Sequence, residues 1–310
     1  MHNCHNILRN EVNDHMSYIL SCCTSVDLPA ELLHTRDIRW TGFHVTLGDT
    51  EYRDDFGATM PYPEFYRAMT EGADTKTAQI NVDEYMQYFT ALLNEGKDLF
   101  HLVLSSGLSG SYNSACIAAE ELREQFPERK IVILDSRMAT AGEGLLLEKL
   151  ADLRDAGLSI EELEAWTLEH RLEVQGWFFT TDLTWFIKGG RVSKLSGWFG
   201  TMLNICPLLN INFEGKLVPR AKLRGKNAVI NALLDKMEAH AAGGTAYDGP
   251  CRLVHANTPE DAATVIAQIE DRFPALKGKV QLTYVGTTIG AHTGPGAVGL
   301  FFWGDRREEE

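Results

Sequence analysis

The feature that most constrains the fold is an alternation of short apolar runs with amphipathic segments. The apolar runs at residues 99–104 and 130–135 have the length and composition of buried strands. The segment at residues 111–126 and the one that contains Leu145 to Leu150 repeat apolar residues at helical spacing. Strands that are apolar on both faces and joined by such helices are typical of a parallel sheet. The sequence therefore predicts an α/β fold.

Further elements extend this pattern along the chain. A short strand is predicted at residues 17–21, and a helix at residues 82–93 with Asn81 as its N-cap. Ser159 and Glu162 have the spacing of a capping box that opens another helix. Four further strands are predicted, at residues 174–179, 208–213, 252–256 and 280–285. The strand at residues 252–256 is followed by a helix start at Thr258, Pro259 and Glu260.

The chain has 310 residues, about twice the usual size of a domain. The pattern breaks at Gly157, so we expect an N-terminal α/β domain at residues 16–157 and a C-terminal α/β domain at residues 158–310. Residues 1–15 are expected to form a flexible N-terminal extension. Its residues His2, Cys4 and His5 belong either to a frayed chain end or to a metal-binding site.

Acidic residues outnumber basic ones by 43 to 29, which gives a net charge of −14 at pH 7. This charge repels phosphate backbones and argues against nucleic-acid binding. No apolar run reaches the ~20 residues of a membrane-spanning helix, and the N-terminal segment lacks the apolar core of a secretory signal. We therefore expect a cytoplasmic protein. Its 6 cysteines form no CxxC pair, which favours free thiols, and we expect no metal site.

Three loops rich in glycine and hydroxyl residues carry the chemical signal. The first, at residues 105–111 (SSGLSGS), follows a predicted strand and precedes a predicted helix, which is where α/β sheets bind ligands. The N–H groups and the positive end of that helix, together with the serine hydroxyls, suit a carboxylate or a phosphate. A well-capped turn without a ligand is the alternative.

The other two loops are expected at residues 75–81 (TKTAQIN) and 289–302. The hydroxyls of the former stand before a predicted helix, either as caps or as ligand donors. The latter holds His292 among glycines and a proline, where Gly294 and Gly296 permit positive φ. His292 is either a solvated side chain or a group that donates to an oxyanion or titrates near neutrality.

Together with residues 188–193 (KGGRVS), these loops resemble the DegV family of bacterial lipid-binding proteins. The resemblance rests on SSGLSGS, KGGRVS and IGAHTGPG in the family's order and extends from about Cys22 to Phe302. It implies two α/β domains with a long-chain fatty acid such as palmitate between them. The better understood members are binding subunits of bacterial fatty acid kinase. They present the carboxylate to a separate ATP-using kinase subunit, which makes acyl-phosphate for phospholipid synthesis.

The resemblance also implies roles for individual residues. Thr77, Ser109 and His292 match family residues at the carboxylate, and Arg224 matches an arginine at the mouth of the site. Ser106 and Gly107 of the same glycine loop are assigned to the carboxylate, and Arg191 to the mouth or to partner docking. The chain departs from the family pattern where Ala78 replaces a serine, Ile80 a proline and Cys23 an aspartate. No residue is assigned a catalytic role, and no cofactor is implied beyond the bound lipid.

The implied ligand is physically consistent with these residues. A buried carboxylate needs several donors, because burying it unpaired is costly. Burial of the acyl chain contributes on the order of 0.8 kcal/mol per CH₂, roughly 12 kcal/mol gross for a palmitate chain. The tail should therefore dominate affinity. Residues that form either a tunnel wall or ordinary core are Trp177, Phe178, Phe179, Trp185, Phe186, Trp198, Phe199, Met202, Leu203 and Ile205.

Other interpretations stay open. The protein is alternatively an enzyme for a small phosphorylated or carboxylated metabolite, with His292 as acid or base, or a lipid-responsive interaction protein without a kinase. Against an enzyme, the sequence has no Ser-His-Asp order, no paired carboxylates near the loops and no metal spacing. Two basic stretches are either solubilising surface or a docking face for an acidic kinase or an anionic membrane. Contact with a membrane is expected to be peripheral at most. The basic residues of these stretches are Lys188, Arg191, Lys194, Lys216, Arg220, Lys222, Arg224 and Lys226.

Overall fold

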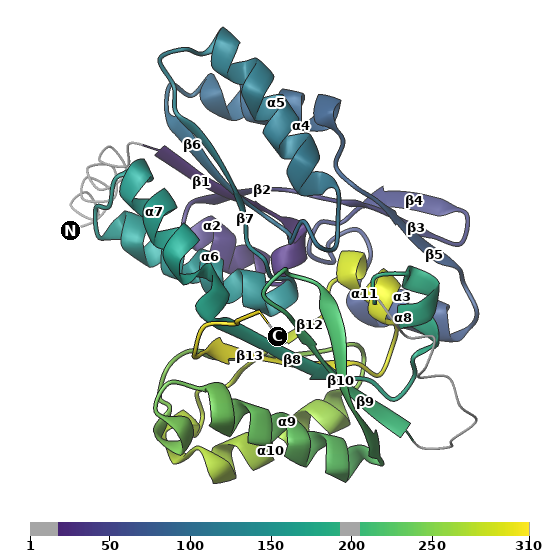
Figure 1. The fold of residues 1–310 in the computed structure, drawn as a ribbon. Helices are drawn as coiled ribbons and strands as arrows, with labels where there is room; N and C mark the ends of the chain where they lie inside the picture. Colours follow the sequence, from purple (N-terminus) through teal and green to yellow (C-terminus); the bar gives the residue numbers. More distant parts are fainter. Residues whose placement is uncertain (1–17, 193–204, 310) are drawn as a thin grey trace, which may run out of the picture.

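The computed structural model describes residues 18–192 and 205–309, which form three sheets with covering helices (Figure 1). The expected extension at residues 1–15 lies outside the described residues. The first sheet is parallel, has the order β2-β1-β6-β7, and confirms the expected parallel sheet. Its strands are β1 (Tyr18–Cys23), β2 (Ile38–Thr41), β6 (Asp98–Val103) and β7 (Ile131–Asp135).

Helices cover both faces of this sheet (Figure 1). One face carries α4 (Val82–Leu93) and α5 (Ser111–Gln125), and the other carries α2 (Ala30–Thr35), α6 (Thr140–Asp155) and α7 (Ile160–His170). The predicted N-cap at Asn81 and the predicted capping box at Ser159 are both present, and Asn81 also forms a capping box with Glu84. Because α7 packs against β7, the chain stays with the first sheet beyond Gly157, and the domain boundary there remains a prediction.

The second sheet has six strands in the order β10-β9-β8-β13-β11-β12. Its neighbours run antiparallel except for β11 and β12. α9 (Lys226–His240) and α10 (Pro259–Arg272) cover one face, and α6 packs on the other (Figure 1). The strands are β8 (Val174–Phe179), β9 (Ile205–Ile211), β10 (Leu217–Arg224), β11 (Cys251–His255), β12 (Gln281–Tyr284) and β13 (Val298–Trp303).

Strand β8 shows how the two faces of this sheet differ. Successive side chains of a strand point to opposite faces. Accordingly, Trp177 and Phe179 belong to the core under α9 and α10, whereas Phe178 belongs to the core that the sheet shares with α6. This alternation brings one aromatic ring of the run, rather than all three, to the interior between the two sheets.

Several elements differ from the sequence predictions. The loop expected at residues 75–81 begins with strand β5 (Thr75–Ala78), which joins β3 (His44–Leu47) and β4 (Thr50–Arg53) in an antiparallel sheet. The loop expected at residues 289–302 contains the end of helix α11 (Thr287–Thr293) and most of β13. The strand predicted at residues 208–213 ends at Ile211, because the chain turns there into β10. The short helices α3 (Tyr62–Thr70) and α8 (Thr184–Gly189) complete this region.

Helix α11 is fixed at its start by two buried carboxyl groups of the N-terminal half. Asp27 Oδ1 accepts a hydrogen bond from the N–H of Gly286 at 3.0 Å. Asp54 Oδ2 accepts from the N–H of Thr288 at 3.1 Å and from its hydroxyl at 2.5 Å. These bonds satisfy donors at the helix N-terminus from residues more than 200 positions away in the chain. The helix therefore bridges the halves of the molecule.

Candidate functional site

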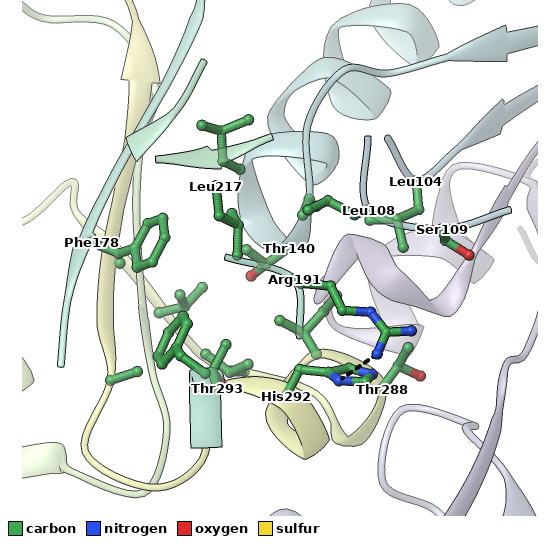
Figure 2. A pocket seen from close by; sticks show the side chains of 18 of the residues that line it. Leu104, Leu108, Ser109, Thr140, Phe178, Arg191, Leu217, Thr288, His292 and Thr293 are labelled. Atoms are coloured by element: carbon green, nitrogen blue, oxygen red, sulfur yellow. Dashed lines mark hydrogen bonds between the residues drawn. The ribbon is translucent and has the colours of Figure 1, made fainter. Parts of the chain in front are cut away.

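A cavity of about 340 Å³ lies between the first and second sheets (Figure 2). This volume is within the range of small-molecule sites. Its wall is mainly apolar and draws on strands, loops and helices of both halves. The apolar wall residues include Phe43, Leu104, Leu108, Phe178, Phe186, Ile211, Leu217, Val254, Val285, Ile289, Val298 and Phe301.

One part of the wall is polar and is built around His292 (Figure 2). His292 Nε2 lies 2.7 Å from the Thr77 hydroxyl, and Nδ1 lies 3.4 Å from Arg191 Nη1. Burial, and then the positive charge of Arg191, lower the pKa of His292 to about 4. The imidazole is therefore neutral at physiological pH.

The hydrogen bonds define which nitrogen carries the hydrogen. A guanidinium group only donates, so Nδ1 of His292 accepts from Arg191. The ring hydrogen then sits on Nε2 and is donated to Thr77 Oγ1. As a result, Thr77 keeps its own hydroxyl hydrogen for a ligand. His292 acts here as the group that orients Thr77.

Ser109 supplies a second hydroxyl to the same cavity. Its Oγ accepts the N–H of Ser111 at 3.2 Å, so its hydroxyl hydrogen is also left to donate. Ser111 begins α5, a helix of 15 residues whose N-terminus carries a partial positive charge. Thr77, Ser109 and His292, which are far apart in sequence, thus meet at one cavity, beside the cationic but exposed Arg191.

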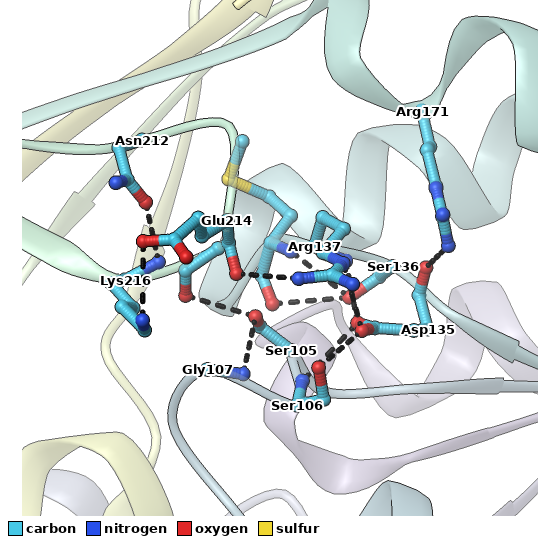
Figure 3. A network of polar contacts seen from close by, with 12 residues as sticks. Ser105, Ser106, Gly107, Asp135, Ser136, Arg137, Arg171, Asn212, Glu214 and Lys216 are labelled. Carbon is cyan, nitrogen blue, oxygen red and sulfur yellow. Dashed lines mark hydrogen bonds and ion pairs between the residues drawn. The ribbon is translucent and has the colours of Figure 1, made fainter. Parts of the chain in front are cut away.

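Ser106 and Gly107 lie elsewhere, in the polar network of Figure 3. The Ser106 hydroxyl donates to Asp135 Oδ2 at 2.5 Å, and its N–H donates to Oδ1 at 3.2 Å. The N–H of Gly107 donates to Ser105 Oγ at 3.1 Å. Neither residue lines the cavity. Their donors are used to shape the loop that presents Leu108 and Ser109.

This loop is docked onto the turn between β9 and β10, and we refer to the contact as the loop–turn contact (Figure 3). Ser105 Oγ donates to the Gly215 carbonyl at 2.9 Å, and Arg137 Nη1 donates to the Glu214 carbonyl at 2.8 Å. A side chain at Gly107 would approach the carbonyl oxygens of Gly215 and Glu214 to 2.8 and 2.9 Å. Glycine is therefore required where the two backbones meet.

The GAHTGPG motif also has a structural reason. Gly294 ends α11 with a φ of 67°, and a Cβ there would lie 2.0 Å from the Trp185 ring. Only glycine combines that backbone conformation with the close approach of an indole. The motif thus brings α8, which carries Trp185 and the cavity residue Phe186, against the end of α11.

The remaining expected site residues are distributed differently. Arg224 ends β10, is exposed and is not part of the cavity wall. Of the expected tunnel residues, Phe178 and Phe186 line the cavity. Trp198, Phe199, Met202 and Leu203 lie outside the described residues, as does Lys194 of the basic stretches.

The sequence reasoning missed four polar residues of the wall: Gln79, Thr140, Thr288 and Thr293. Gln79 stands two residues after Thr77, in a segment whose hydroxyls alone were considered as caps or ligand donors. Thr288 and Thr293 belong to α11. This segment was predicted as a loop because it is rich in glycine, which disfavours helices. Thr140 follows β7, and its position at the carboxyl end of a parallel strand is the one signal that pointed to it.

Neither a metal centre nor a membrane span emerges from residues 18–192 and 205–309. They contain no cluster of three histidine, cysteine, aspartate or glutamate side chains placed to hold a metal ion. None of their helices is long and apolar enough to cross a membrane.

Comparison with known proteins gives the family. The sequence model described as "uncharacterised protein, DegV family" matches residues 24–305. The chain belongs to the DegV family. It is similar to a DegV domain-containing protein of Clostridium perfringens, with 31% identity over 94% of this chain and 99% of that protein. A DegV domain-containing protein of Lactococcus lactis is 33% identical over 92% of this chain and 97% of its own length.

Solved structures of DegV proteins share the fold. A DegV family protein of Ruminococcus gnavus, solved with vaccenic acid, superimposes with a TM-score of 0.81 at 23% identity and covers 92% of this chain and 99% of its own. The Streptococcus pneumoniae fatty acid kinase B3 protein, loaded with linoleic acid, gives a TM-score of 0.79 at 23% identity over 94% of this chain and 100% of its own. These likenesses confirm the expected DegV-like fold.

Proposed function

We propose that this DegV family protein binds a long-chain fatty acid and presents its carboxylate to a separate kinase that forms acyl-phosphate. The observation that carries the proposal is the position of Thr77, Ser109 and His292 on the wall of one apolar cavity. The hydroxyls of Thr77 and Ser109 each keep a hydrogen to donate, which suits a carboxylate. The bound fatty acids of the Ruminococcus and Streptococcus proteins support the same ligand class.

The arrangement favours a binding protein over an enzyme. His292 has a lowered pKa near 4 and is held between Arg191 and Thr77, so it is a poor general acid or base at neutral pH. A carboxylate held by neutral hydroxyls remains a nucleophile toward phosphate supplied by a partner. Arg191 is exposed beside His292, at the place where such a partner would reach the head group. Because the partner uses ATP, we assign the protein to the cytoplasm.

The first experiment identifies the ligand. Protein purified under native conditions is denatured, extracted with organic solvent and examined by mass spectrometry. We expect a long-chain fatty acid in near-stoichiometric amount. Correctly folded protein that contains no lipid and takes up none from an added palmitate solution contradicts the proposal.

The second experiment distinguishes the three functions. Loaded protein is mixed with ATP and a candidate kinase subunit, and acyl-phosphate is trapped with hydroxylamine. Product that requires both proteins supports presentation to a kinase. If the protein binds lipid but no kinase subunit of the source organism forms acyl-phosphate with it, the result favours an interaction protein. Turnover of a small metabolite by this chain alone favours an enzyme.

A further inference from the structure

The cavity extends along one face of the second sheet, over strands β8 and β13. Phe178 of β8 pairs with Gly299 of β13, and both residues line the cavity. In Figure 2, Phe178 lies on the side of the view away from Ser109 and His292, which belong to the proposed head-group site. An acyl chain held there by its carboxylate would therefore extend toward this face of the sheet.

Phe301 is the last residue of β13 that lines the cavity. The strand begins at Val298, shortly after α11 and its His292, so Phe301 lies further along it from the head-group site. In the sheet, Phe301 is opposite Gly176 of β8. Neither Gly176 nor the β8 residues before it belong to the cavity wall. The cavity therefore ends at the position of Phe301.

Three glycines surround the ring of Phe301. A Cβ atom at Gly142 of α6 would lie 2.6 Å from the ring atom Cδ1. Cβ atoms at Gly176 and Gly299 would lie 2.9 Å from Cε1 and 3.0 Å from Cε2. Real Cβ atoms rarely or never have such close contacts, so the ring fills space that side chains of both strands and of the helix would otherwise occupy. Phe301 thus closes the gap between the sheet and α6.

An ion pair fixes the width of this gap beside Phe301. Arg252 of β11 is opposite Phe301 on its other side in the sheet. Its Nε and Nη2 donate to the carboxylate of Glu148 on α6 at 2.7 and 2.6 Å. The Arg252 side chain is buried, and separating a buried ion pair is costly. The wall at Phe301 is therefore rigid, and a longer acyl chain has no room to pass between α6 and the sheet.

We propose that Phe301 sets the greatest acyl-chain length that the cavity accepts. The inference rests on the proposed fatty-acid function and identifies the residue at which the tail ends. Each CH₂ group that enters the cavity should improve affinity by about fourfold. A CH₂ group that meets the Phe301 ring gains nothing, because adding atoms to a well-packed core is destabilising. Affinity should therefore rise with chain length, reach an optimum and then fall.

The test uses delipidated full-length protein and saturated fatty acids that differ only in length: laurate, myristate, palmitate, stearate, arachidate and behenate. Relative dissociation constants are measured by competition with a fluorescent fatty acid, below the micellar concentration of each acid. Phe301→Leu and Phe301→Ala should move the optimum to longer acids, by about two carbons or more in the alanine variant, because truncation of a buried ring leaves a cavity. Phe301→Leu removes less volume and is the milder change for the fold.

Phe302→Leu is the matched control. Phe302 is the next residue of β13, is also buried, and belongs to the core under α9 and α10. Its truncation should lower the unfolding midpoint in urea as Phe301→Leu does, but it should leave the optimal chain length unchanged. In the double variant Phe301→Ala/Gly176→Leu, a side chain from the opposite strand refills the same place, so the optimum should return toward that of the unmodified protein.

The outcomes separate this inference from the proposed function. If the folded, unmodified protein binds none of the acids, the fatty-acid site is wrong and the inference falls with it. If it binds them but both Phe301 variants keep its optimal length, the proposed function stands and the inference about Phe301 is overturned. A shift in Phe302→Leu as large as that in Phe301→Leu also overturns it, because the cause is then a loosened fold.

Discussion

The hydroxyl hydrogens of Thr77 and Ser109 are the groups that we expect to hold a carboxylate. Each hydroxyl oxygen accepts one bond from the protein, so its hydrogen is directed away from that donor. Hydrogen bonds to a charged group contribute about 1.5–3 kcal/mol, less than the burial of a long tail at about 0.8 kcal/mol per CH₂. The two hydroxyls therefore fix orientation more than they fix affinity.

This argument gives a prediction for Ser109→Ala and Thr77→Val. Palmitate affinity should fall by about tenfold per lost hydrogen bond and stay measurable, because the tail contacts remain, and acyl-phosphate formation with the kinase should fall by tenfold or more even when the protein is saturated with palmitate. Affinity is measured by calorimetry and turnover by hydroxylamine trapping. Thr264→Val, a hydroxyl deletion on the exposed side of α10, is the control. An unchanged turnover in the two site variants would remove these residues from the head-group site.

The ionisation of His292 gives a second prediction. The pKa of His292 is lowered to about 4 by burial and by Arg191, so the folded protein should show no titration of this ring between pH 5 and 8. Removing the positive charge in Arg191→Ala should raise the pKa, while burial still keeps it below that of a free histidine. The measurement is a heteronuclear NMR titration of delipidated protein. A midpoint near 6.5 in the unmodified chain would contradict this account.

Ser106 and Ser109 show how far the roles of individual residues can be predicted from sequence. Both stand in the same loop, and their residue types and spacing predict the same chemistry. Only the fold brings Asp135 to Ser106, which uses that hydroxyl, and leaves Ser109 to face the cavity. Thr77 was identified by its motif, but its orientation depends on His292, which is 215 residues away.

At the scale of elements, the loop–turn contact joins two parts of the cavity wall. The loop carries Leu108 and Ser109, and the turn connects Ile211 to Leu217. Gly107→Ala places a methyl group against two backbone carbonyls, so we expect a loss of about 1–3 kcal/mol in unfolding free energy and faster lipid release. Gly110→Ala is the control for the unfolding midpoint, because the atoms nearest to its added methyl group belong to the end of the Gln79 side chain rather than to backbone.

The readouts for this pair are the unfolding midpoint in urea and the rate of palmitate exchange into vesicles. A Gly107→Ala protein that matches the unmodified chain in both would show that the close approach is not needed. Equal losses in both variants would show that the loop tolerates no added methyl group anywhere, and that the carbonyls of Glu214 and Gly215 are not the cause.

Elements that are apolar on both faces were predicted well, and those held by distant partners were not. β6, β7 and β8 are buried runs whose composition alone indicates strands. β5 alternates between exposed and half-buried residues over four positions, which is too short for a periodic signal. α11 contains glycine and leads into a Gly-Pro-Gly turn, and its start is capped by Asp54, which no local pattern could supply.

At the scale of the whole molecule, buried ionisable groups make stability depend on pH. Burial raises the pKa of Asp27 and Glu143 well above the usual values, so these carboxyls bind protons more tightly folded than unfolded. Their contribution is present below the unfolded pKa and is lost as pH rises through the folded pKa. His101 and His292 have lowered pKa values, about 3 and about 4, and act in the opposite sense as pH falls below 6.5.

The prediction concerns Glu143→Gln. Each such carboxyl costs about 1.4 kcal/mol of unfolding free energy per pH unit above its unfolded pKa, until the folded pKa is passed. The neutral amide of Glu143→Gln does not titrate, so the free energy of unfolding should decline less steeply as the pH rises above the unfolded pKa of glutamate. Urea unfolding at a series of pH values measures this slope. The exposed Glu124→Gln should leave it unchanged, and an unaltered slope in Glu143→Gln would show that this carboxyl does not titrate with folding.

The cavity wall gathers residues from Phe43 to Phe301, and β13, which contributes the last of them, is inserted between β8 and β11. During translation, the cavity cannot close until that late strand has left the ribosome and paired with both neighbours. Until then the apolar side chains of the cavity wall are exposed to water and to other chains. Any ligand of this cavity is therefore expected to enter after synthesis, and fast pairing of β13 with β8 and β11 would shorten the time in which the open faces can aggregate.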